Sequence, residues 1–170
     1  MVNQLTSNAE ALRLFFTEDI YLVAKSNEIE LTEAVVIATQ KLKTTFKYLG
    51  KNQKNILILV NDNQNDVSTE QGRELLRKLV KAINLTANDF ALVNYSDYTS
   101  EKYNDLKAFF NCKLMIAFGV NAIDLNLPTQ PLHQLINYAE ATLLFAKNLH
   151  DLDTDQVSKK ILWTSLQQLK

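Results

Sequence analysis

The segment Ile56–Val60 constrains the fold more than any other part of the sequence, because it is an unbroken run of Ile, Leu and Val residues. Such a run is typical of a strand that is buried on both faces, as in parallel sheets covered by helices on each side. Later segments with the same apolar character are also predicted as strands: 90–93, 113–118 and 142–146.

Helical patterns separate these strands. Apolar residues at helical spacing predict helices over 69–83, 100–110 and 154–169, with Ser68 capping the first and Thr154 opening the last. Strands that alternate with helices are usually joined by right-handed crossovers within one parallel sheet. The pattern therefore predicts an α/β fold, a three-layer sandwich with a central four-stranded parallel sheet.

The first fifty residues have a different pattern. A capping-box motif predicts a short helix near the start, and 20–23 is predicted as a brief extended segment. A second helix is predicted over 31–49, ending at Gly50. We therefore expect an N-terminal helical segment, residues 1–50, attached to an α/β domain over residues 51–170, the two forming one compact unit.

Polar or small residues follow each predicted strand. Asn61 and Asp62 follow the first, Asn94 the second, Gly119 the third and His150 the fourth. In open α/β sheets, ligands bind outside the carboxyl ends of the strands. We therefore expect these five residues to line a crevice at that edge of the sheet.

Asp62 and His150 are weak catalytic candidates within this crevice. A carboxylate and an imidazole together can orient or activate a water molecule. Carboxylates at strand exits more often cap the following loop by accepting hydrogen bonds from backbone amides. We favour the capping role and assign no catalytic residue.

The sequence offers no motif for a cofactor or a metal. Cys112, the single cysteine, directly precedes a strand and is predicted to be a buried thiol. The two histidines, His133 and His150, lack the paired spacing of a zinc site. There are only three glycines, and neither a Walker A loop nor a G-x-G-x-x-G motif is present. We expect no cofactor and no metal.

Charge and hydropathy limit the possible partners. The sequence has 18 Lys and Arg against 19 Asp and Glu, a net charge of −1, so direct nucleic-acid binding is expected to be weak or absent. The apolar runs are far shorter than the roughly 20 residues that span a bilayer. The N-terminus lacks the basic region of a secretory signal. We expect a cytoplasmic protein that does not bind membranes.

Two short apolar clusters lie near the N-terminus, outside the predicted sheet. A polar stretch over 17–19 separates them. Such clusters either pack within the chain or dock on a protein partner. The residues of this predicted contact segment are Phe15, Phe16, Ile20, Tyr21 and Leu22.

Trp163 lies in the last predicted helix, where apolar residues recur at helical spacing. This pattern favours packing of the helix against the core. A contact with a partner is the alternative, because Trp is enriched at the centres of protein interfaces.

Taken in order, the strand ends resemble those of the uracil-DNA glycosylase-like superfamily. Asp62 matches the Asp of that family's G-Q-D-P-Y loop, Asn94 its L-N strand end, and Gly119 its hydrophobic-W-G strand end. His150 falls on the H-P-S-P loop. The resemblance implies a parallel sheet between helices. The first loop keeps only its Asp and the last only its His, so base excision is not expected.

The layout is most similar to the psi subunits of bacterial DNA polymerase III, a non-catalytic branch of this superfamily. Psi subunits open with an amphipathic and an extended piece, as over 12–23 here, and carry N-D after the first strand, as at Asn61 and Asp62. Their last helix contains L-W, as at Leu162 and Trp163. In psi subunits the opening segment contacts the clamp loader and the α/β body binds the chi subunit.

The resemblance implies a protein-interaction adaptor in a replication complex. One alternative is a divergent glycosylase that uses Asp62 to activate water and His150 to stabilise the departing base. Another is a small-ligand domain that uses the strand-end crevice.

Overall fold

The computed structural model describes residues 44–169. The chain divides into two units, residues 1–43 and 44–170, and the described residues all belong to the second. The predicted contact segment and the predicted elements within residues 1–43 lie outside the described residues.

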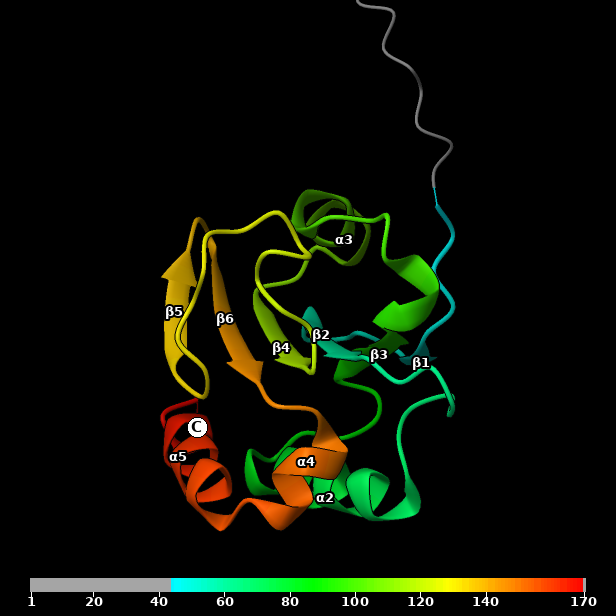
Figure 1. Ribbon diagram of the computed structural model, residues 1–170. Coiled ribbons are helices and arrows are strands. Elements are labelled where there is room, and N and C mark those ends of the chain that lie inside the picture. The colour runs from blue at the N-terminus through cyan, green and yellow to red at the C-terminus, as the bar shows by residue number, and fades with distance from the viewer. Residues whose placement is uncertain (1–43, 170) are drawn as a thin grey trace, which may run out of the picture. The chain divides into compact units, whose positions relative to one another are not determined.

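The second unit is built on one six-stranded sheet (Figure 1). Its strands are β1 Leu49–Gly50, β2 Ile56–Val60, β3 Phe90–Asn94, β4 Leu114–Phe118, β5 Leu135–Tyr138 and β6 Ala141–Ala146. They lie in the order β1-β3-β2-β4-β6-β5. The inner strands β3, β2, β4 and β6 are parallel, whereas β1 and β5 pair antiparallel at the two edges. The predicted α/β fold with a mostly parallel sheet is confirmed, but the sheet has six strands rather than four.

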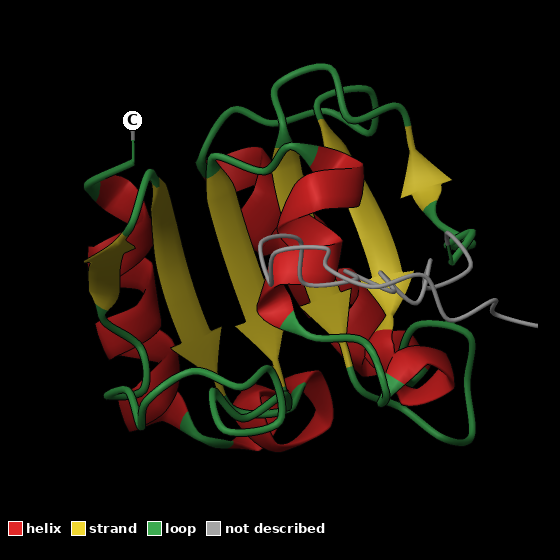
Figure 2. Ribbon diagram, turned by 90° about the horizontal axis from the view of Figure 1, so that it is seen from above, coloured by secondary structure: helices red, strands yellow, loops and turns green. Residues whose placement is uncertain are grey.

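Helices lie against both faces of the sheet (Figures 1 and 2). The α-helices of the described residues are α2 Glu70–Ala82, α3 Tyr103–Phe110, α4 Leu149–Thr154 and α5 Gln156–Gln167, and η1 Tyr95–Tyr98 is a 3₁₀ helix. Apolar residues of α2, α4 and α5 join one buried cluster, and those of α3 and η1 join the other. The structure therefore has three layers, with the sheet in the middle.

The position of β2 in the middle of the sheet explains why its sequence is apolar throughout rather than alternating. All five of its side chains are buried. Leu57 and Leu59 belong to the cluster beneath α3, while Ile56, Ile58 and Val60 belong to the cluster beneath α2, α4 and α5. Because strand side chains alternate between faces, two helical layers are needed to bury this one strand.

Two helix boundaries differ from the predictions. The N-cap of α2 is Thr69 rather than Ser68, since the Thr69 side chain accepts a hydrogen bond from the Gly72 backbone nitrogen at 3.3 Å. The last predicted helix is two helices, because Thr154 ends α4 and Asp155 caps α5 through a 3.0 Å hydrogen bond from the Ser158 backbone nitrogen.

The helix predicted over 31–49 is wrong in its described part. Residues 44–48 are not helical, and Leu49 and Gly50 form the edge strand β1. Phe46 is buried against Tyr98 and Phe110, with ring centroids 4.9 and 5.4 Å away. Phe46 is thus apolar because it contacts η1 and α3. The spacing of apolar residues in the sequence does not distinguish such contacts from the packing of a helix.

Within residues 44–169, no helix is long and apolar enough to cross a membrane.

We predict that Phe46→Ala lowers the free energy of unfolding by about 3 kcal/mol, because it empties a buried aromatic site. Phe46 is 4% exposed, whereas Leu49, three residues on, is 57% exposed. Leu49→Ala is therefore the matched control and should cost less than about 1 kcal/mol. Urea denaturation of both variants measures the difference. Equal losses would show that Phe46 is not an anchor of the sheet edge.

Candidate functional site

The carboxyl ends of β2 and β4 mark the point where the chain leaves the sheet toward opposite faces. After β2 the chain leads to α2 on one face. After β4 it enters a segment whose Val120, Ala122 and Leu125 side chains are buried in the cluster on the other face. Such a switch point is where open α/β sheets form their binding crevices.

Two asparagines join the strand ends at this point. The Asn61 side chain, after β2, donates a 2.9 Å hydrogen bond to the Gly119 carbonyl after β4. The Asn148 side chain, after β6, donates a 3.0 Å hydrogen bond to the Asn61 carbonyl. Gly119 has φ +71°, and a Cβ there would lie 3.2 Å from the Cβ of Asn148. Glycine therefore allows the β4 and β6 ends to approach closely.

Asn94 makes the corresponding connection on the other side of β2. Its side-chain nitrogen donates to the carbonyls of Asp62 at 2.7 Å and Asn65 at 3.1 Å. Its side-chain oxygen accepts from the Asp62 and Ser96 backbone nitrogens at 3.2 and 3.3 Å. Asn61, Asn94 and Asn148, which we call the strand-end asparagines, thus connect the ends of all four parallel strands.

The Asp62 carboxylate caps its own loop. Its Oδ1 accepts hydrogen bonds from the Gln64 and Asn65 backbone nitrogens at 2.8 and 2.9 Å, and the Asn65 side chain donates to both carboxylate oxygens. Partial burial raises the pKa of Asp62, but these hydrogen bonds, with a smaller contribution from His150, bring it below its ordinary value. A carboxylate with a lowered pKa is a weaker base.

His150 lies in the first turn of α4, with its side chain exposed to solvent. Its backbone nitrogen donates a 3.0 Å hydrogen bond to the Asn148 side chain, the N-cap of the helix. Because the same Asn148 side chain also donates to the Asn61 carbonyl, next to Asp62, both candidates lie at the same corner of the sheet. The structure thus brings the two weak catalytic candidates near each other, although no hydrogen bond between their side chains occurs among the described residues.

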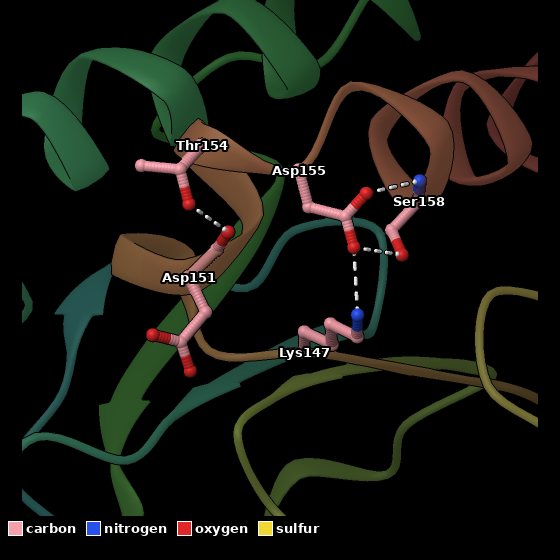
Figure 3. Close-up of polar contacts among 5 residues, drawn as sticks. All are labelled: Lys147, Asp151, Thr154, Asp155 and Ser158. Carbon is pink, nitrogen blue, oxygen red and sulfur yellow. Dashed lines mark hydrogen bonds and ion pairs between the residues drawn. The ribbon is translucent and has the colours of Figure 1, made fainter.

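The segment that the resemblance equates with the H-P-S-P loop is helix α4. Leu149 and Leu152, one turn apart, are buried against the sheet. The Thr154 hydroxyl donates to the Asp151 carbonyl at 2.9 Å in the last turn of α4 (Figure 3). Without the prolines of that motif, nothing in this segment prevents a helix from following Asn148.

Asp155 stabilises the junction between α4 and α5. Its carboxylate accepts hydrogen bonds from the Lys147 ammonium and the Ser158 hydroxyl, each at 2.6 Å (Figure 3). The Lys147 hydrogen bond, followed by those from Ser158, holds the pKa of Asp155 well below its usual range. These contacts connect the end of β6 to the start of α5.

Sequence reasoning missed Asn148 and Asn65. Of the residues after the fourth predicted strand, only His150 is a predicted site residue. An asparagine at a strand exit is compatible with any polar loop, so its sequence position alone does not reveal a bridging role. The sequence does contain one indication of such a role, because Asn also occurs directly after the first predicted strand and after the second.

Cys112 is a buried thiol, as predicted, and burial raises its pKa to about 11. It is therefore a poor nucleophile at neutral pH. In residues 44–169, no group of three or more His, Cys, Asp or Glu side chains is placed to hold a metal ion.

Two of the hollows on the described surface bear on the predicted site. One of about 90 Å³ is next to Asn94, between β1 and the loop residues Asp66 and Val67. The other, about 410 Å³, lies between α2 and α5 and includes none of the five predicted crevice residues.

No protein-family model matches this sequence, and no curated protein matches it either.

We predict that Asn61→Ala lowers the free energy of unfolding by about 1–2 kcal/mol, because it leaves the Gly119 carbonyl without its side-chain donor. Asn63→Ala is the matched control, since the exposed Asn63 side chain makes no hydrogen bond within the described residues. Thermal or urea denaturation compares the two. A loss for Asn63→Ala as large as that for Asn61→Ala would contradict a specific bridging role.

His133 is expected to make the free energy of unfolding depend on pH. It is 5% exposed, and neither ring nitrogen has a hydrogen-bond partner among the described residues. Its backbone connects β6 with α5, donating to the Phe145 carbonyl and accepting from the Ser165 hydroxyl, each at 2.6 Å. Burial, followed by the charge of Lys147, lowers its pKa, against a smaller opposing effect of Asp155.

We predict that acid destabilises the native protein through His133. A histidine with a lowered native pKa binds its proton more tightly when unfolded, so stability falls as the pH drops below the ordinary value of about 6.5. The slope from this residue is at most about 1.4 kcal/mol per pH unit. We choose His133→Asn because Asn tolerates the φ of +62° at this position. Because this variant lacks the titrating imidazole, the free energy of unfolding from urea denaturation should change less between about pH 7.5 and 5 than in the wild-type protein.

The matched control for this experiment is His150→Asn, which removes an exposed imidazole at the strand ends. It should retain the pH slope of the wild-type protein. If it removes the slope and His133→Asn does not, His133 is not the acid-sensitive group.

Proposed function

We propose that this protein is a non-catalytic adaptor with a uracil-DNA glycosylase-like fold, acting as a psi-like subunit of a DNA polymerase III clamp-loader assembly. The observation that carries the non-catalytic part is the hydrogen bonding at the strand ends. Asn61, Asn94 and Asn148 bond to neighbouring strand ends, and Asp62 is occupied by its own loop. A general base needs a carboxylate that can accept a proton from water.

The architecture supports the glycosylase-like part of the proposal. The resemblance implies a parallel sheet between helical layers, and the four inner strands are parallel and lie between two such layers. Helix α4 includes His150, which the resemblance aligns with the glycosylase H-P-S-P loop, and capping by Asn148 accounts for a helix at this segment. Both features suit a member of the superfamily that keeps the sheet and lacks the catalytic loops.

The proposed partner contact lies in the N-terminal unit. Phe15, Phe16, Ile20, Tyr21 and Leu22 form the contact segment on this proposal. The chain divides after residue 43, so these residues and the sheet belong to different units. A short apolar segment of this kind is suited to docking on a protein partner.

A divergent glycosylase is the alternative, and one observation favours it. His150 and Asp62 interact electrostatically at the same corner of the sheet. The hydrogen bonds that lower the pKa of Asp62 oppose its use as a base. The net charge of −1 also gives no general attraction to a DNA backbone.

We predict that the full chain binds the purified clamp-loader assembly of its own cells, and that Phe15→Ala with Phe16→Ala weakens this binding at least about tenfold, as expected for apolar interface anchors. Surface plasmon resonance measures both affinities. Ile123→Ala, which trims a 67% exposed apolar side chain of the α/β unit, is the matched control and should bind like the wild-type protein. Unchanged binding by the double variant would contradict the contact segment, and no binding by the wild-type chain would contradict the proposed assembly.

A further inference from the structure

A groove of about 410 Å³ runs between α2 and α5, on the helical layer opposite α3. Its floor includes Leu75 and Leu79 of α2, which are almost fully buried. One wall carries Trp163 of α5, which is 39% exposed. Both helices lie on the same side of the sheet (Figure 1). We call this hollow the α2–α5 groove.

The charges along the groove differ in whether they are paired. On the α5 side, the Lys159 ammonium donates to the Asp153 carbonyl at 2.7 Å and to its carboxylate at 3.3 Å. On the α2 side, Glu74 and Lys78 line the groove, are exposed, and make no ion pair or hydrogen bond within the described residues.

Glu74 pairs with neither arginine of its own helix. The two arginines of α2, Arg73 and Arg77, both turn toward Glu70 instead. Glu74 and Lys78 lie one turn apart on the same face, and both contribute to the groove. The α2 wall thus presents one negative and one positive charge, separated by a helical turn, next to an exposed indole.

We propose that the α2–α5 groove is the interface of a homodimer. A two-fold axis brings the same patch of both copies together, so a patch must be complementary to itself. Two α2 helices packed antiparallel across such an axis place Glu74 of each copy against Lys78 of the other. The two Trp163 side chains then cover the grooves from the sides. Glu74 and Lys78 make the patch complementary to itself, because they carry opposite charges on one helix face. A patch with charges of one sign would repel the same patch of the second copy.

The size of the surface predicts a weak dimer. Helix α2 has 13 residues and α5 has 12. At 1.5 Å per residue and with neighbouring helices about 10 Å apart, their shared face covers about 400 Å². A stable interface buries about 800 Å² per partner. Association should therefore be seen only at high protein concentration.

Sedimentation equilibrium of the full chain tests this proposal. The average mass should rise from 19.4 kDa toward twice that value as the concentration increases from about 10 µM to about 1 mM. Glu74→Lys and Lys78→Glu should each weaken the dimer about tenfold, because every substitution acts at two symmetric contacts. The double variant exchanges the two charges and should restore the wild-type affinity. Trp163→Ala should weaken it by a similar factor.

Lys113→Glu is the control for the change in net charge, since Lys113 is exposed and does not line the groove. It should dimerise like the wild-type chain. A monomer at every concentration overturns the proposal. A dimer that is insensitive to the single charge reversals, or that the double exchange does not restore, overturns it as well, because association then uses another surface. Circular dichroism spectra of the variants establish that each one is folded.

Discussion

Strand β2 buries all five of its side chains, divided between two apolar clusters on opposite faces of the sheet. This double burial requires helices above and below, and it places β2 between two parallel neighbours, β3 and β4. The carboxyl ends of these strands therefore meet at one edge. The chain leaves β2 and β4 toward different faces, so the edge would open into a crevice unless side chains bridged it.

The strand-end asparagines provide this bridge. Where a strand ends, the next backbone carbonyls no longer accept hydrogen bonds from a neighbouring strand. Burying such carbonyls without another donor lowers the stability of the fold. The amides of Asn61, Asn94 and Asn148 donate to carbonyls of neighbouring strand ends, at distances between 2.7 and 3.1 Å. Asn61 and Asn94, which indicate a site in the sequence, thus join strand ends in the structure, together with Asn148. These contacts are the physical basis on which we propose a non-catalytic role.

The inner strands were predictable because they are buried on both faces, which leaves an unbroken apolar run. The edge strands were not, because Leu49–Gly50 is only two residues long and Leu135–Tyr138 is half exposed, so neither has such a run. The helix predicted to end at Leu49 was wrong because Phe46 packs on η1 and α3 rather than within a helix. The division into α4 and α5 depends on contacts of Asp155 with Lys147 and Ser158, which the linear sequence does not rank above other polar residues.

The predicted crevice residues after the first three strands lie together at the strand ends, but a further bridging residue was not predicted. Asn61, Asp62, Asn94 and Gly119 do interact directly or through shared partners at the strand ends. Asn148, which connects β6 to β2, was missed because bridging depends on the order of strands in the sheet, and sequence alone does not establish that β6 lies next to β4.

The central claim is that these strand-end groups maintain structure and perform no chemistry. Release of uracil from uracil-containing single-stranded DNA by the full chain tests it most directly, with Asp62→Asn in parallel. We expect the wild-type chain and the variant to release uracil at the rate of the protein-free control. Release by the wild-type chain that is lost in Asp62→Asn would contradict the claim and establish Asp62 as a catalytic residue.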